Sequence, residues 1–71
     1  MSFAICLDNK GYEVSLELRK IYQVLQPEPN DPKGYIRIID ESGEDYLYAA
    51  KAFEIIELPP RVERKLVATL R

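Results

Sequence analysis

The hydrophobic positions in the first third of the chain follow the two-residue period of β-strands. Residues 3–7 form an apolar run that ends at the polar turn sequence 8–11. Residues 14–18 then alternate apolar and polar side chains, and residues 21–25 continue as a further strand. Some of these apolar positions also fit helical spacing. We favour strands because the segment is rich in β-branched and aromatic residues and has no convincing helix cap.

A polar loop and a hairpin are predicted in the middle of the chain. Three prolines and a glycine mark residues 26–34 as a loop. Two β-prone runs, residues 35–39 and 46–48, flank the polar turn 40–45. This pattern is typical of a β-hairpin.

The length of the hairpin turn decides which side chains share a face of the sheet. A two-residue turn places Leu47 on the face of Ile36. A three-residue turn places Tyr46 and Tyr48 on that face instead. We prefer the three-residue turn because it puts Gly43 where a positive φ is required.

The last third of the chain predicts a short turn, a strand and a helix. Residues 49–52 are too short for an α-helix and predict one 3₁₀ turn, and residues 53–56 predict the last strand. Pro59 and Pro60 end that strand, and Pro60 suits the first position of a helix. After it, apolar side chains recur every fourth residue at Val62, Leu66 and Leu70. So short a helix is unstable alone, and it must pack on the sheet, pack on a partner or fray.

A chain of 71 residues allows one domain. A closed or nearly closed β-structure suits a short chain, because it has one interior and few free edges. We therefore expect a mainly β fold, with a five-stranded small barrel over residues 1–58. Residues 59–71 form a C-terminal helical extension of the same domain.

Two parts of the sequence resemble known groups of proteins. Residues 48–55, Tyr-Ala-Ala-Lys-Ala-Phe-Glu-Ile, resemble the end of the Src-homology-3-like small barrel, where a 3₁₀ turn leads into the last strand. Residues 12–25 and 37–48 resemble a group of short uncharacterised bacterial proteins, and the motifs cover roughly residues 3–58. The resemblance implies a bacterial protein with a Src-homology-3-like fold. It implies no activity, cofactor or substrate.

The turn before the last strand departs from both groups. Members of the bacterial group often have Pro where Ala49 stands. Peptide-binding Src-homology-3 domains place a Pro and a Tyr in their proline-recognition groove, at positions that align with Ala49 and Ala52. The resemblance therefore supports the fold and argues against proline-peptide binding.

The composition excludes several kinds of catalytic, metal-binding and cross-linked site. The chain has no His and no Trp, and Cys6 is its single cysteine. These absences exclude His-based triads, His-containing zinc sites and an internal disulfide. Cys6 lies between Ile5 and Leu7 and is predicted to be a buried core thiol. Nothing marks two of the acids as an acid–base pair, so we expect no enzyme, no catalytic residue and no cofactor.

The hairpin turn carries four carboxylates. Such a cluster could bind Ca²⁺ or Mg²⁺, which prefer several converging oxygens. The spacing does not match a calcium loop, and acidic residues are common at solvated turns. We interpret the cluster as a solvated tip without a metal, formed by Asp40, Glu41, Glu44 and Asp45.

The hairpin is also the predicted partner-binding surface. Tyr and Arg are enriched at protein interfaces because each combines apolar area with a polar tip. The alternative is that the rings complete the wall of the barrel. The predicted contact residues are Tyr35, Arg37, Glu44, Tyr46 and Tyr48.

Charge divides the chain into two parts. Residues 1–58 have a net charge of −5, and residues 59–71 have a net charge of +3. Three basic side chains of the tail, Arg61, Arg64 and Lys65, form a second predicted contact, with an unidentified protein partner or with a second copy through the helix. The alternative is weak nucleic-acid binding through this tail. The sequence predicts no membrane span and no secretory signal, so we expect a cytoplasmic protein with no membrane partner.

Overall fold

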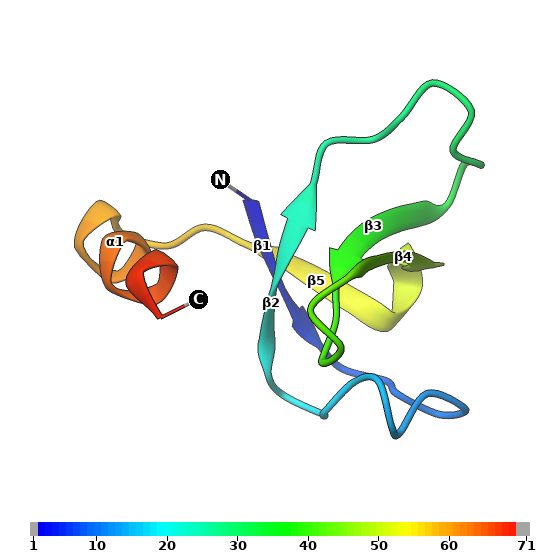
Figure 1. The fold of residues 1–71 in the computed structure, drawn as a ribbon, viewed down its shortest axis with the longest axis horizontal. Coiled ribbons are helices and arrows are strands. Elements are labelled where there is room, and N and C mark those ends of the chain that lie inside the picture. Colours follow the sequence, from blue (N-terminus) through cyan, green and yellow to red (C-terminus); the bar gives the residue numbers. More distant parts are fainter. Residues whose placement is uncertain (1, 70–71) are drawn as a thin grey trace.

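The computed structural model describes residues 2–69, which form five strands, one 3₁₀ turn and one α-helix (Figure 1). The strands are β1 (Ser2–Cys6), β2 (Ile21–Leu25), β3 (Tyr35–Ile39), β4 (Asp45–Ala49) and β5 (Phe53–Ile56). The 3₁₀ turn η1 is Ala50–Ala52, and the helix α1 is Pro60–Ala68. The predicted mainly β fold is confirmed. Within residues 2–69, no helix has the length and apolar character that crossing a bilayer requires.

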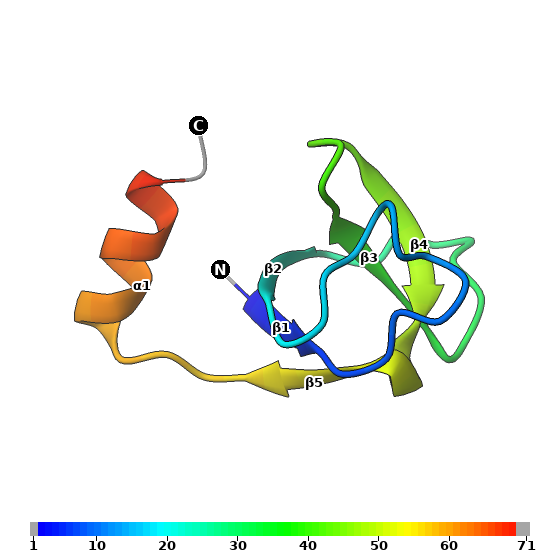
Figure 2. The same ribbon diagram turned by 90° about the horizontal axis from the view of Figure 1, so that it is seen from below.

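The five strands form one antiparallel sheet in the order β4-β3-β2-β1-β5. In the described chain, β4 and β5 are the two edges and do not pair with each other. Between them η1 turns the chain from one edge of the curved sheet to the other (Figure 2). The sheet is therefore open, and the small barrel that we predicted is not shown.

The hydrophobic core lies on one face of the sheet, which we call the inner face. Strand pairing places Ala4 opposite Tyr22, and Cys6 opposite Phe53. These side chains are buried together with Leu16, Ile38 and Tyr48. The predicted burial of Cys6 is confirmed, and burial raises the pKa of its thiol. The opposite face is called the outer face and carries the alternate residues of each strand.

Residues 14–18 form a loop with turns, so the predicted strand is wrong, and the alternative helix is not formed either. Of the alternating apolar side chains only Leu16 enters the core, with 1% of its surface exposed, whereas Val14 is 94% exposed. Positive φ angles at Gly11 and Arg19 turn the chain at both ends of the loop. The loop thus covers the core with the side chain of Leu16. Burying this side chain does not require the loop to pair with a strand.

The hairpin between β3 and β4 has the three-residue turn that we predicted. Ile36 lies opposite Tyr48 in the ladder. The Asp40 amide donates to the Glu44 carbonyl at 3.1 Å, and the Gly43 amide donates to the Asp40 carbonyl at 3.0 Å. Gly43 has a φ of 86°, which is the left-handed conformation that the turn requires.

The predicted 3₁₀ turn, last strand and helix are confirmed, with Pro60 in the first turn of α1. Leu70 lies outside the described residues. No side chain of Pro60–Ala68 is buried. Figures 1 and 2 both show α1 at the end of an extended segment that follows β5, on the side of β1 and β2 that faces away from β3 and β4.

Candidate functional site

A buried carboxylate fixes the hairpin turn. Only 6% of Asp40 is exposed, and its Oδ2 accepts a hydrogen bond of 2.6 Å from the Tyr48 hydroxyl. Its Oδ1 accepts from the backbone N of Ser42 at 2.9 Å and from the Ser42 hydroxyl at 2.6 Å. Burial favours a higher pKa for Asp40, but the bonds from Ser42 and Tyr48 outweigh it and lower the pKa. Burial and the bond to Asp40 raise the pKa of Tyr48 to about 12.

A second tyrosine–carboxylate pair ties the loop to the same turn. The Tyr22 hydroxyl donates to Glu41 Oε2 and accepts from the Glu17 amide at 2.8 Å. Lys20 Nζ lies 2.6 Å from the same Glu41 oxygen, and the Glu41 amide donates to the Ser15 carbonyl at 3.0 Å. Hydrogen bonds from Lys20 and Tyr22 lower the pKa of Glu41. The loop, β2 and the hairpin turn are thus held as one unit.

The acidic turn is therefore not simply the solvated tip that we predicted. Asp40 is buried, Glu41 is bonded to Tyr22, and Asp45 is paired with Arg37. These carboxylates have structural partners because the turn folds against the loop and β3. In the part of the chain that the structure describes, no group of three or more His, Cys, Asp or Glu side chains is placed to hold a metal.

Two adjacent hollows lie beside the hydrogen-bonded pair of Asp40 and Tyr48. The larger, of about 380 Å³, is lined in part by Tyr12, Tyr46 and Tyr48. The smaller, of about 210 Å³, lies toward η1 and is lined in part by Tyr12, Tyr35 and Tyr48. Since Tyr12 and Tyr48 border both hollows, they form one continuous surface. We call this surface the tyrosine groove and define it by Tyr12, Tyr35, Tyr46 and Tyr48.

The tyrosine groove combines a fixed floor with accessible walls. Tyr48 is the floor, with 5% of its surface exposed, whereas Tyr12, Tyr35 and Tyr46 are about half exposed. The rings of Tyr12 and Tyr48 meet edge to face, with centroids 5.1 Å apart and planes at 82°. Lys51 adds a cationic side chain to the lining of the smaller hollow. The groove therefore offers apolar ring surface, hydroxyl groups and charge.

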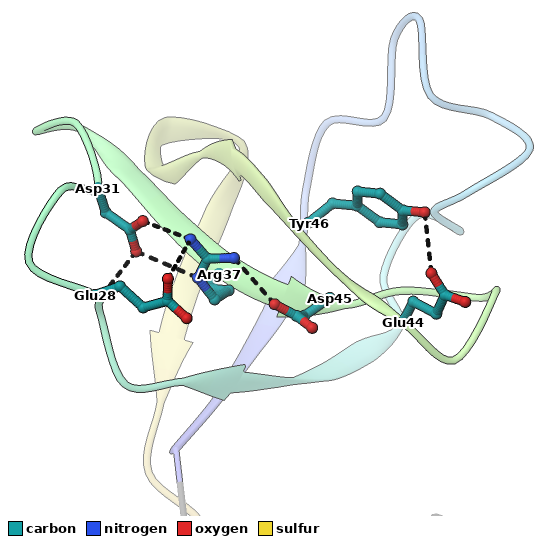
Figure 3. A network of polar contacts seen from close by, with 6 residues as sticks. All are labelled: Glu28, Asp31, Arg37, Glu44, Asp45 and Tyr46. Carbon is teal, nitrogen blue, oxygen red and sulfur yellow. Dashed lines mark hydrogen bonds and ion pairs between the residues drawn. The ribbon is translucent and has the colours of Figure 1, made fainter.

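The structure divides the predicted hairpin surface between two places. Tyr35 and Tyr46 are accessible walls of the tyrosine groove. Glu44 lies beside Tyr46, because its Oε1 accepts a hydrogen bond of 3.3 Å from the Tyr46 hydroxyl (Figure 3). Tyr48 belongs to the core, so its predicted role as an exposed contact is corrected to that of the floor.

Arg37 lies on the outer face, away from the floor of the groove, because the ladder pairs it with Leu47 rather than with a core residue. Its guanidinium binds both carboxylate oxygens of Asp31, and Asp45 accepts from it at 3.0 Å (Figure 3). Glu28 lies 3.6 Å away. These carboxylates raise the pKa of Arg37, and the bond from Arg37 lowers the pKa of Asp31. Arg37 is therefore engaged within its own chain.

The three basic residues predicted as a second contact lie on α1 and are exposed there. Arg61, Arg64 and Lys65 do not line the tyrosine groove, and α1 lies on the side of β1 and β2 that faces away from β4 (Figure 1). The predicted site residues thus occupy three regions: the groove, the outer face and the helix.

Two contacts of the site were missed by sequence reasoning. Tyr12 lies between the predicted turn 8–11 and the predicted strand 14–18, and its approach to Tyr48 was not foreseen. Asp40 carried a usable signal, because an Asp two residues before a Ser in a turn commonly accepts a bond from that amide. That signal predicts the local bond but not the buried contact with Tyr48.

No family model, no curated protein and no solved structure matches this chain.

Proposed function

We propose that this protein is a non-catalytic interaction module, or a small subunit of a complex, that binds an extended protein segment in the tyrosine groove. The observation that carries the proposal is the pair of adjoining hollows that share Tyr12 and Tyr48. Half-exposed Tyr46 lines the larger hollow, and half-exposed Tyr35 lines the smaller one. The tyrosine rings of the groove suit an extended partner segment whose side chains enter the two hollows in succession.

The physical basis is the low entropic cost of binding on a fixed tyrosine surface. Tyrosine offers a large apolar area and a hydroxyl while losing few rotatable bonds, which is why it is enriched at binding hot spots. Tyr48 is held by Asp40, and the loop that carries Tyr12 is held by Leu16 and the Glu41 bonds. The groove is thus largely formed before a partner arrives.

We further propose that the sheet is a Src-homology-3-like small barrel with an open side between β4 and β5. Three features support this architecture: the antiparallel strand order, the loop that covers the core between β1 and β2, and the 3₁₀ turn before the last strand. The groove then lies beside that turn, where Ala49 and Ala52 replace the Pro and Tyr of proline-recognition sites. The partner segment is accordingly not defined by proline.

Selection from a phage-displayed library of random peptides tests the proposal. The full chain should enrich related peptides, and Tyr12→Ser or Tyr46→Ser should weaken their binding about tenfold or more, as loss of an interface hot spot does. Val14→Ser is the matched control, because Val14 is an exposed apolar residue of the same loop that lines neither hollow. Circular dichroism confirms that each variant is folded.

Either of two results would overturn the proposal. One is that no peptide family is enriched over a library panned without the protein. The other is that peptides bind the folded Tyr12→Ser and Tyr46→Ser variants as tightly as they bind the Val14→Ser control.

Weak nucleic-acid binding is the second candidate function, favoured by the three exposed basic side chains of α1. A labelled oligonucleotide should then bind with an affinity that falls steeply with salt, because phosphate contacts release counterions. Arg61→Gln, Arg64→Gln and Lys65→Gln together should abolish that binding. An affinity that does not change with salt concentration, or binding that persists in the triple variant, contradicts nucleic-acid binding by the helix.

A further inference from the structure

The two ends of the tyrosine groove differ in the charges that border them. The larger hollow lies at the hairpin turn, where Ser42 lines it, and we call this part the turn end. The smaller hollow lies at η1, where Lys51 lines it, and we call this part the η1 end. Both hollows share Tyr12 and Tyr48. A segment that spans the groove therefore meets both sets of charges.

The turn end carries two carboxylates that no cation neutralises. Asp40 lines the larger hollow, and the hydroxyls of Ser42 and Tyr48 that donate to it are uncharged. Glu44 is exposed and accepts the hydrogen bond from the Tyr46 hydroxyl (Figure 3). Within residues 2–69, neither carboxylate belongs to an ion pair. The charge and hydrogen bond of Glu44 and, to a smaller extent, the charge of Asp40 raise the pKa of Tyr46, as an anionic environment does.

The η1 end has the opposite sign. Lys10 and Lys51 line the smaller hollow together with a single acidic residue, Asp8. Two lysines against one aspartate leave a net charge of +1. Both lysines are exposed, and no ion pair of the described chain includes either of them. Their ammonium groups are therefore available to an anionic group of a partner.

The fold holds the two lysines together although they are far apart in the sequence. Lys51 belongs to η1, and the Ala52 carbonyl at the end of η1 accepts from the amides of Leu7 and Asp8 at 2.9 and 3.2 Å. The Asp8 carboxylate in turn accepts from the Lys10 amide at 3.0 Å. These bonds fix the segment of Lys10 beside η1. The charges of the groove thus stand in place before a partner arrives, which favours charge-selective binding.

We propose that the tyrosine groove selects an extended segment with an acidic side chain for the η1 end and a basic side chain for the turn end. The acidic side chain meets Lys10 and Lys51, and the basic side chain approaches Glu44. Apolar or aromatic residues between them pack on the tyrosine rings. This inference rests on the function proposed above and names the chemistry of its partner. Charge complementarity of this kind contributes more to specificity and orientation than to affinity.

Parallel selections from the phage-displayed peptide library test this chemistry. The wild type should enrich peptides with an acidic and a basic residue on opposite sides of an apolar core. The double variant Lys10→Glu, Lys51→Glu should lose the preference for the acidic residue, and Glu44→Lys should lose the preference for the basic one. Lys33→Glu and Glu54→Lys are the matched controls, because both residues are exposed and line neither hollow. Each control should enrich the same peptides as the wild type.

Fluorescence anisotropy with one labelled peptide from the wild-type selection measures the contact at the η1 end. Together, Lys10→Gln and Lys51→Gln should weaken its binding about fivefold at an ionic strength of about 0.15 M, as the loss of a partly exposed ion pair does. Replacing the acidic residue of the peptide by its amide should weaken binding to the wild type equally. The same peptide change should cause no further loss in the double variant, because the interaction is already absent. Lys33→Gln should leave the affinity unchanged.

Two different results would overturn the inference. In the first, peptides whose binding depends on Tyr12 and Tyr46 carry no pattern of charge, or bind the folded charge variants as tightly as the controls. The groove then binds segments without selecting charge, and the proposed function stands. In the second, no peptide family is enriched, and the proposed function fails together with the inference. Circular dichroism confirms that each variant is folded.

Discussion

Replacement of Asp40 by Ala tests the polar support beneath the tyrosine groove. The side chain is 6% exposed and accepts three hydrogen bonds: one from the Tyr48 hydroxyl and two from Ser42. Its removal leaves the buried Tyr48 hydroxyl without its acceptor and frees the turn at Ser42. The turn also holds the loop through the Glu41 amide, so the change should spread to the walls of the groove.

The expected cost follows from the burial of each bond. A buried hydrogen bond to a charged group contributes about 1.5–3 kcal/mol. The two bonds from Ser42 lie closer to solvent, where water replaces them at a cost of about 0.5 kcal/mol each. We therefore expect Asp40→Ala to lower the free energy of unfolding by about 3 kcal/mol. For a domain of this size, that corresponds to a fall in Tm of roughly 12–24 °C.

Urea and thermal unfolding, followed by circular dichroism, measure this loss. Glu44→Ala is the matched control, because Glu44 is an exposed carboxylate of the same turn whose side chain bonds only weakly, at 3.3 Å, to Tyr46. It should change the stability by less than about 0.5 kcal/mol. A double-mutant cycle of Asp40→Asn and Tyr48→Phe should give a coupling of about 1–2 kcal/mol. Equal losses for Asp40→Ala and Glu44→Ala, or a coupling near zero, would refute the reasoning.

Three further predictions concern the core, the ionisation of Tyr48 and the hairpin turn. Leu16→Ala should lower the free energy of unfolding by about 2–4 kcal/mol, whereas Val14→Ala in the same loop should have little effect; urea unfolding that shows similar losses would contradict the role of Leu16. The pKa of Tyr48 is raised from about 10 to about 12, so its contribution is complete below pH 10 and is lost as the pH rises toward 12. The stability of the wild type should therefore fall more steeply over that interval than the stability of Tyr48→Phe, and parallel curves would contradict this. Gly43→Ala should cost about 1–2 kcal/mol because Gly43 has a φ of 86°, and an unchanged urea midpoint would show that the turn adapts.

The hairpin and the C-terminal segment could be predicted because local features determine them. Gly43 allows the positive φ of a three-residue turn, and the turn length then fixes the pairing of Ile36 with Tyr48. Pro59 and Pro60 end the last strand and begin the helix through their fixed φ. In each case, the decisive residue acts on its own neighbours in the chain.

The loop before β2 and the role of Arg37 could not be predicted in the same way. The alternation of residues 14–18 indicates a strand, but the side chain of Leu16 is buried by core residues from distant strands. Arg37 alternates with core residues along β3 and therefore points to the outer face. There Asp31 and Asp45, which come from different segments, engage it. Sequence pattern alone does not give these partners.

The sequence by itself thus determined the elements of this protein: the strands other than the misread segment, the three-residue turn, the 3₁₀ turn and the helix. Turn geometry, proline and side-chain period act over a few residues and leave a readable pattern. The tertiary structure alone decided that Asp40 is buried beneath Tyr48 and that Tyr12 completes the groove. It also placed α1 on the β1–β2 side of the sheet, with no side chain of Pro60–Ala68 fully buried. These outcomes depend on which distant segments meet, because burial and hydrogen-bond satisfaction are settled only when the chain has folded.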